Sequence, residues 1–430
     1  MKRTSLILAL LAAASLTQAA SHTWSGAVSG YWNNDANWSV GGAPDPGETN
    51  VTLLFPPGAT RYVTTNNIAG LEVRSLALNG DYTLAGSGGA MLTFAGVGAN
   101  ASLNGSHVNT IASSLPVVLN SGVTFNLNHV AARLTIDSVI SGPQGLAKNG
   151  PGVLVFSGLN ANTYGNITQV MEGELRLSQA NLFPVLAVPG RLTIGTTNLA
   201  EPALVRLFQN HQIANNNVVV ISPSGTLALN GNLDTIGELQ MTGGAVTTDS
   251  GADPGTLTLG GTVTYNDPPT SNGSIAGHLS LGETMRTFDI KGGTLEITAS
   301  IDDGVANAGF TKTGSGLLDL YAANTYDGPT IVNGGYLRVY HPFALGDDLG
   351  AAADTTVNGP GRLALQNGIT VTGEALQLNH FGELYAVGVC QWNGSVALNG
   401  TAFLDTFDGG LCTVGGVISG PGILEKQGLG

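Results

Sequence analysis

The stretch that decides the fold spans residues 309–346 and reads GFTKTGSGLLDLYAANTYDGPTIVNGGYLRVYHPFALG. Apolar and other residues alternate over 317–321 and again over 336–340, and turns rich in Gly or Asn bound each run. Alternation with period two is typical of short β-strands, and Gly and Asn are the residues that tight turns favour. The stretch therefore predicts one unit of a repeat array and not a catalytic loop.

The same pattern returns in two other places. From residue 139 the chain has Lys148 in the place of Lys312, and 162–164 (Asn-Thr-Tyr) in the place of 324–326. From residue 415 a further unit begins and reaches Lys426 shortly before the end of the sequence. Because this last unit stops before its strands are complete, we expect the chain to be a fragment of a longer protein.

These motifs resemble the autotransporter-associated β-strand repeat, also called the passenger-associated transport repeat. The shared pattern is I-S-G-x-G-x-L-x-K-x-G-x-G, followed by L-x-L, N-T-Y-x-G and a Gly before the second alternating run. The resemblance is most complete over residues 312–337. It implies an all-β fold, a right-handed parallel β-helix (β-solenoid), and a role in secretion or surface display. It implies no reaction.

The composition suits such a fold and excludes some functions. The 430 residues include 63 Gly, and 29 Asp and Glu outnumber 15 Lys and Arg, which gives a net charge of -14. Few charges with many turn formers favour short strands joined by tight turns. The acidic balance disfavours nucleic acid as a partner, because few cations are available to neutralise phosphates.

The first residues predict an export signal. A basic start at Lys2 and Arg3 precedes an apolar run over 6–16 and small residues at 17–19. That run is too short for a membrane span, so we expect residues 1–19 to be a signal peptide. No later stretch is apolar enough for a membrane helix. An anchor or translocator is expected beyond Gly430, with a location outside the cell or on a bacterial surface.

Alternating apolar pairs recur along the rest of the chain. The pairs that begin at Leu134, Leu154, Leu175 and Leu192 follow one another at similar intervals. These intervals fit one coil of a solenoid, which buries its inward side chains against the coils above and below. At about 20 residues per coil and ~4.8 Å per strand, the chain would form on the order of 20 coils and a rod near 100 Å long. The solenoid is expected over 61–430, with repeat units near 139–177, 305–346 and from 415.

The segment 20–60 differs from the repeats. It holds Trp24, Trp32 and Trp38, three of the four Trp residues, within fifteen positions. A solenoid end exposes apolar core and unpaired strand edges, so an aromatic segment folded over the first coil would act as a cap. The alternative is a glycan contact, since exposed Trp faces stack on sugar rings. We favour the cap.

The two cysteines, Cys390 and Cys412, are separated by close to the length of one coil. Strands of adjacent coils lie ~4.8 Å apart, within the separation that a disulfide tolerates. A disulfide and two unbonded thiols are both compatible with this spacing.

The candidates for chemistry are weak. The adjacent acids 302–303 and 347–348 could divide acid and base roles only if the fold set two carboxylates about 5 to 10 Å apart. Solvated carboxylates in turns are the simpler interpretation. Ser250 lacks the glycines of a nucleophile motif, the seven His are scattered, and the calcium-binding nonapeptide is missing. We expect no catalytic residue, no metal and no cofactor.

The recurring residues are interpreted as structural. Lys148, Lys312 and Lys426 hold the same place in each unit, whereas a catalytic lysine would be singular. We expect them to be charges that keep the coil edge soluble, beside turns such as the one at Gly335. We expect the recurring Asn side chains to bond turn backbone and the Tyr rings to cover the coil corner. These residues are Asn162, Tyr164, Asn324 and Tyr326.

The sequence thus predicts an exported, non-enzymatic passenger-type β-solenoid that assists secretion, surface display or adhesion. The alternative is a carbohydrate-binding or carbohydrate-active β-helix. That alternative would gain weight if the three Trp residues lined a groove, or if residues 302–303 faced other acids. The extracellular ligand is not identified by the sequence, although a polysaccharide is compatible with it.

Overall fold

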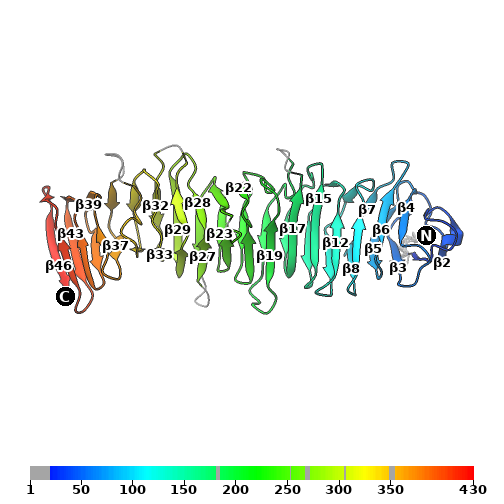
Figure 1. Cartoon of the computed structure of the whole chain (residues 1–430), viewed down its shortest axis with the longest axis horizontal. Helices are drawn as coiled ribbons and strands as arrows, with labels where there is room; N and C mark the ends of the chain where they lie inside the picture. Colours follow the sequence, from blue (N-terminus) through cyan, green and yellow to red (C-terminus); the bar gives the residue numbers. More distant parts are fainter. Residues whose placement is uncertain (1–19, 181–184, 252, 267–271, 305–306, 348–353) are drawn as a thin grey trace, which may run out of the picture.

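The computed structural model describes residues 20–430 except 181–184, 252, 267–271, 305–306 and 348–353. The expected signal peptide, 1–19, lies outside the described residues, and so does Asp348 of the second acidic pair. Figure 1 shows an elongated molecule in which strands cross the long axis and the two chain ends lie at opposite ends. The predicted all-β, parallel solenoid is confirmed, with about 16 turns.

The turns contribute strands to two long sheets, some turns place two strands in the first sheet, and some add one on a third face. The first sheet contains β1 (Ser21–Trp24), β2 (Trp38–Val40), β3 (Val51–Phe55), β5 (Glu72–Leu78), β7 (Leu92–Phe94), β8 (Asn100–Leu103), β10 (Val117–Leu119), β11 (Val123–Leu127), β13 (Ile140–Ser141), β14 (Leu146–Asn149), β16 (Thr168–Val170), β18 (Leu192–Ile194), β20 (Val219–Ile221), β23 (Leu239–Met241), β26 (Val263–Asn266), β29 (Arg286–Gly292), β32 (Phe310–Thr313), β34 (Thr330–Val332), β36 (Thr355–Val357), β39 (Leu376–Asn379), β42 (Val396–Asn399) and β45 (Ile418–Ser419).

The second sheet contains β4 (Val63–Asn66), β6 (Thr83–Gly86), β9 (Val108–Ile111), β12 (Arg133–Ile136), β15 (Val153–Gly158), β17 (Gly173–Gln179), β19 (Ala203–Leu207), β21 (Gly225–Ala228), β24 (Ala245–Thr247), β27 (Gly273–Ala276), β30 (Thr294–Ile297), β33 (Leu317–Leu320), β35 (Tyr336–Val339), β37 (Arg362–Leu365), β40 (Glu383–Ala386), β43 (Thr401–Thr406) and β46 (Ile423–Gly428). The third face carries two short sheets, β22 (Leu233–Ile236), β25 (Thr256–Leu259), β28 (His278–Ser280) and β31 (Ser300–Asp302), and β38 (Thr370–Val371), β41 (Val389–Trp392) and β44 (Leu411–Val414). One 3-10 helix, η1, spans Asp35–Asn37.

Pairing between coils is parallel and in register. In the second sheet Leu318 is in register with Leu337, and the coil between them is short. Leu175 is in register with Val205, and the coil between them is much longer. The coil length expected from the sequence is therefore close to the shortest coil length in the structure. Longer turns and the strands of the third face lengthen many other coils. This is why the chain forms fewer coils than expected.

The core is a column of stacked aliphatic side chains. Leu134 pairs with Leu154, and Leu154 with Leu175, and all three are fully buried. A second row runs through Leu318, Leu337 and further residues of later coils. Because side chains alternate across a strand, every second residue points inward and contributes to this column. Each coil therefore buries its apolar residues on its neighbours, as a repeat architecture requires.

Candidate functional site

Two of the repeat lysines lie inside the solenoid and bind backbone carbonyls. The ammonium group of Lys312 donates to the carbonyl oxygens of Thr313, Gly314 and Gly334, each at 2.9 Å. Lys148 donates in the same way to Gly150 at 2.5 Å and to Glu172 at 2.7 Å. Two of the three carbonyls that bind Lys312 belong to its own turn, and the third comes from the following coil.

The expectation of a solvated charge at the coil edge is wrong for both of these lysines. Lys148 and Lys312 have 0% of their surface exposed. Gly335, which follows the third carbonyl, has φ +60°, and a Cβ there would lie 2.4 Å from the carbonyl oxygen of Gly316 and 2.7 Å from that of Gly314. The glycine is therefore required both for the turn and for the close approach of the preceding coil. Lys426 is exposed and donates only to two carbonyls of its own turn, Gln427 and Gly428.

Burial lowers the pKa of Lys148 and of Lys312 to about 8. The unfolded chain keeps an ordinary lysine pKa near 10.4, so between pH 8 and 10 it holds more protons than the folded chain. The free energy of unfolding should therefore rise with pH in this window, by up to ~1.4 kcal/mol per pH unit for each lysine. The buried tyrosines Tyr164 and Tyr326, whose pKa burial raises, oppose this trend above pH 10.

The measurement is urea unfolding between pH 7 and 11 on the wild type and on variants. The quantity compared is the slope of the free energy of unfolding against pH. Lys312→Met should remove about half of the lysine contribution to this slope, and the double variant with Lys148→Met should remove all of it. Other titrating groups cancel because the slopes are compared between chains. An identical slope in the double variant would contradict the prediction, whatever the absolute stability of that variant.

The repeat asparagines each join three coils. Asn324 accepts from the backbone N–H of Ile301 at 2.8 Å and donates to the carbonyl of Ala344 at 2.6 Å. Asn162 accepts from Ile140 and donates to Ala187, both at 2.9 Å. Both side chains are buried. Each amide thus satisfies one backbone group of the preceding coil and one of the following coil, where no strand provides a partner.

The repeat tyrosines are buried beside these asparagines. The hydroxyl of Tyr164 lies 2.6 Å from Thr168 Oγ1, and that of Tyr326 lies 2.7 Å from Thr330 Oγ1. Tyr326 also packs edge-on against Phe310, with ring centroids 5.5 Å apart. The two units therefore repeat the same three buried polar contacts, those of the lysine, of the asparagine and of the Tyr–Thr pair.

The three N-terminal tryptophans form one buried cluster around Phe55. Trp24, Trp32 and Trp38 are 1%, 0% and 6% exposed. Their ring centroids lie 5.2 to 6.1 Å from each other or from the Phe55 ring. Trp32 Nε1 donates to Thr64 Oγ1 at 3.0 Å. These ring faces are covered by protein, so they do not line an open groove.

The two cysteines lie side by side. Cys390 of β41 is in register with Cys412 of the parallel strand β44, and they are not bonded in the structure. Cys390 is buried and Cys412 is partly exposed. In-register neighbours on parallel strands point to the same side, within the reach of a disulfide.

We therefore expect air or glutathione disulfide to oxidise the pair to an intramolecular disulfide. Non-reducing peptide mass mapping should find 390 and 412 linked, with a chain mass two units lower. Cys412→Ser should abolish the product. Intermolecular dimers, or two free thiols after prolonged oxidation, would contradict the expectation.

The acidic pairs give a mixed result. Asp302 accepts from the N–H of Gly304 at 3.2 Å, as a turn carboxylate does. Asp303 is buried and accepts from the backbone N–H of Ala308 at 3.0 Å and from that of Asp327, on the next coil, at 3.5 Å. Burial and the neighbouring Asp327 raise the pKa of Asp303. The chain thus brings Asp303 to another acid, which is the arrangement named above as favouring the carbohydrate-active alternative.

Other sequence candidates are not brought together. Ser250 bonds the backbone of Asp253 in both directions, which makes it part of a turn. Within the part of the chain that the structure describes, no three His, Cys, Asp or Glu are grouped to hold a metal. In the same residues no helix is long and apolar enough to cross a membrane.

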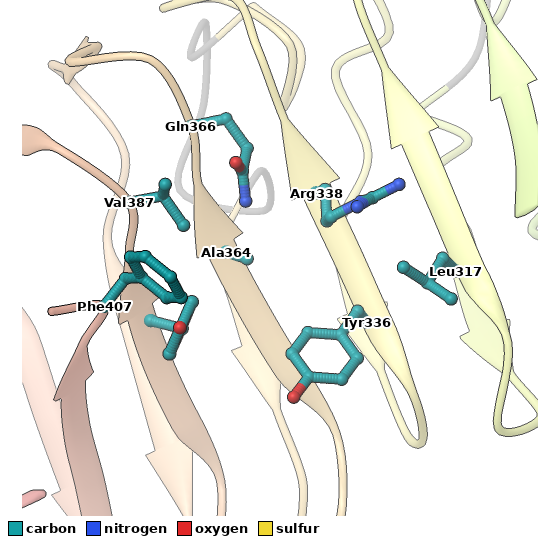
Figure 2. A pocket seen from close by; sticks show the side chains of 8 residues that line it. Leu317, Tyr336, Arg338, Ala364, Gln366, Val387 and Phe407 are labelled. Atoms are coloured by element: carbon teal, nitrogen blue, oxygen red, sulfur yellow. The ribbon is translucent and has the colours of Figure 1, made fainter. Parts of the chain in front are cut away.

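One candidate site is a groove on the outer face of the second sheet, here called the sheet groove. It holds about 310 Å³ and is lined by Leu317, Tyr336, Arg338, Ala364, Gln366, Tyr385, Val387 and Phe407. Figure 2 shows these side chains rising from neighbouring parallel strands, with Ala364 between larger neighbours. Ala364 is in register with Arg338 on one side and Tyr385 on the other, so the small side chain leaves the hollow.

Ion pairs fix the two arginines at and beside the sheet groove. Arg338 Nε donates to Asp319 at 2.6 Å, and the pair is bidentate. Arg362 lies 2.8 Å from a carboxylate oxygen of Glu383 and 4.9 Å from the centroid of the Tyr336 ring. Arg338 and Arg362 are thus neutralised within the protein, and their planes are held against the sheet.

Sequence reasoning missed the sheet groove. Its residues come from several coils, and each looks like an ordinary outward position of a strand. The available signal was the concentration of Tyr and Phe at outward positions after residue 317, at Tyr336, Tyr385 and Phe407.

The fold and the repeated buried contacts define a parallel β-solenoid. Residues 146–177 and 310–339 match the passenger-associated-transport-repeat family, so the chain carries two repeats of this family. A relative described as the adhesin BmaC autotransporter, from Brucella suis biovar 1 (strain 1330), is 30% identical over 164 residues. The match covers 37% of this chain and 5% of that protein. No solved structure gave a significant match.

Proposed function

We propose that this chain is an exported, non-enzymatic segment of a passenger-type protein, which supports secretion and presents an adhesive surface outside the cell. The observation that carries the proposal is the shared construction of the two family repeats. Lys148 and Lys312, with Asn162 and Asn324, make the same bonds in both units. Residues that recur in this way serve the stacking of coils.

The comparisons support export and adhesion. The matching family is named for passenger-associated transport, and the relative is named as an adhesin and an autotransporter. We assign residues 1–19 to the signal peptide, 20–60 to a capping segment and 61–430 to the solenoid. The buried cluster of Trp24, Trp32 and Trp38 supports the capping role, because it covers the first coil with apolar rings.

The test is a binding assay with the purified chain coated on beads. Beads should attach to cultured animal cells or to extracellular matrix, and free chain should compete in a dose-dependent way. Attachment equal to that of albumin-coated beads would overturn the adhesive part of the proposal. Secretion is tested separately, by removing residues 139–177 from the chain in an exporting host and measuring the amount that reaches the medium.

One specific observation favours the enzymatic alternative: the carboxyl group of Asp303 lies beside Asp327 of the next coil. A carboxyl group whose pKa is raised by burial and by a neighbouring acid is a candidate for a general acid. Incubation with a polysaccharide panel should release no reducing ends if our proposal is right. Release of new ends by the wild type, but not by Asp303→Asn, would make the protein an enzyme.

A further inference from the structure

We infer that the sheet groove binds a neutral glycan, with a sugar ring placed over Ala364 and against the aromatic side chains that line the groove. This inference rests on the proposed adhesive function and names the class of ligand that the surface would recognise. Three properties of the groove support it: its shape, its hydrogen-bonding groups and its charge.

The shape suits a sugar ring. Ala364 forms the floor, and Figure 2 shows Tyr336 and Phe407 on either side of it. Tyr385, in register with Ala364, also lines the groove. Tyr336 and Tyr385 are held edge-on to each other, with ring centroids 6.4 Å apart. A pyranose ring has an apolar face of C–H groups that packs on an aromatic ring, and aromatic side chains with a polar tip suit a site that is half wet. A volume of about 310 Å³ lies at the small end of ligand pockets, whose range is roughly 300 to 1,000 Å³.

Polar groups stand at the edges of the same hollow. Gln366 carries two amide donors and an acceptor, and the Tyr385 hydroxyl can donate or accept. The Arg338 guanidinium has five N–H donors, and its bonds to Asp319 use two of its nitrogens. Sugar hydroxyls both donate and accept, so this mixed set matches them better than it would match a purely apolar ligand.

The charge favours a neutral ligand. Arg338 and Arg362 are already paired with Asp319 and Glu383, and Asp405 is in register with Tyr385. The whole chain has a net charge of -14. A sialylated or uronic glycan would bring a carboxylate to a surface whose cations are already neutralised, at a cost from like charges nearby. The ligand class is therefore a neutral oligosaccharide.

Within the sheet groove the aromatic rim and the amide can be tested separately. Tyr385→Ala removes one stacking ring, and Gln366→Leu keeps the size of the side chain but removes its hydrogen bonds. The matched control is Phe208→Ala. Phe208 and Phe407 each follow a strand of the second sheet directly, and both are exposed, but Phe208 lies far from the groove.

The experiment measures binding of the purified chain to an array of neutral, sialylated and uronic oligosaccharides, followed by titration calorimetry on the best ligand. We expect saturable binding to a neutral glycan, at least tenfold weaker in Tyr385→Ala and in Gln366→Leu, and unchanged in Phe208→Ala. Circular dichroism confirms that each variant is folded. The inference is overturned by absence of neutral-glycan binding, by binding to acidic glycans only, or by equal binding of all variants.

The outcome is separable from that of the proposed function. Beads that attach to cells while no neutral glycan binds would leave adhesion standing and remove the sheet groove as its site. Glycan binding that depends on Tyr385, without attachment of beads, would keep the groove and remove the adhesive role.

Discussion

Replacing Trp32 with Ala should destabilise the N-terminal coils by about 3–5 kcal/mol, the usual cost of removing a fully buried large aromatic side chain. Trp32 is 0% exposed and contacts the rings of Trp38 and Phe55. The loss of its ring would also remove an edge-on contact of Trp38, although the backbone carbonyl of residue 32 still accepts the indole N–H of Trp38. Without this cluster the first coil would expose its apolar side chains to water.

Urea unfolding and limited proteolysis together measure this effect. The protease should cut Trp32→Ala first within the N-terminal coils, because stability in a solenoid is local and spreads through neighbouring coils. Trp32→Phe should retain part of the packing and show a smaller loss. The neighbouring Tyr31→Ala is the control, since Tyr31 is 53% exposed and its loss should change little. If Trp32→Ala and Tyr31→Ala were equally stable, the capping role would be wrong.

The second large effect is expected for Asn324→Ala. The substitution leaves the N–H of Ile301 and the carbonyl of Ala344 without their partner in a buried place. An unsatisfied buried polar group costs about 1–3 kcal/mol, and two such groups are created, so we expect a loss of about 2–5 kcal/mol. Asn162→Ala should behave in the same way, because its two bonds are equivalent.

The control for the asparagine series is Asn104→Ala. Asn104 also bonds across coils, accepting from Asn128 at 2.7 Å, but it lies on the surface, where water replaces a lost partner. We expect a change within about 0.5 kcal/mol. Denaturant midpoints and slopes measure the series. Similar losses for Asn324→Ala and Asn104→Ala would show that the three-coil bridge has no special energetic role.

The fold could be predicted because its rule is local. In the alternating segments around Leu134, Leu154 and Leu175, every second side chain points inward. Because such segments recur at regular intervals, the inward side chains can be buried by stacking the coils. Cys390 and Cys412 are separated by close to one coil length, so the sequence also indicated that they could be neighbours on adjacent coils. The structure shows them in register. The number of coils was overestimated because loop lengths vary between units.

The environment of the lysines could not be predicted by the same route. A lysine beside a glycine turn looks like a surface residue, since lysine is almost never fully buried without partners. The partner that completes the Lys312 site, the carbonyl of Gly334, lies on the next coil. Only stacking brings that carbonyl within 2.9 Å of the ammonium group.

The sheet groove escaped prediction for a related reason. Its floor is a single small residue, Ala364, whose effect depends on the sizes of its in-register neighbours Arg338 and Tyr385. Those neighbours belong to the preceding and the following coil. A hollow on a flat sheet is a property of several coils together, and no single repeat unit contains it.

The lysine sites give the stack a polarity. Each buried lysine binds carbonyls of its own turn and completes its set of partners with a carbonyl of the following coil. The coil that follows such a lysine supplies the last carbonyl that its ammonium group binds. The addition of folded coils toward the C-terminus is thus stabilised at these two positions. Unfolding of the coil that follows Lys148 or Lys312 would leave that ammonium group with the carbonyls of its own turn alone.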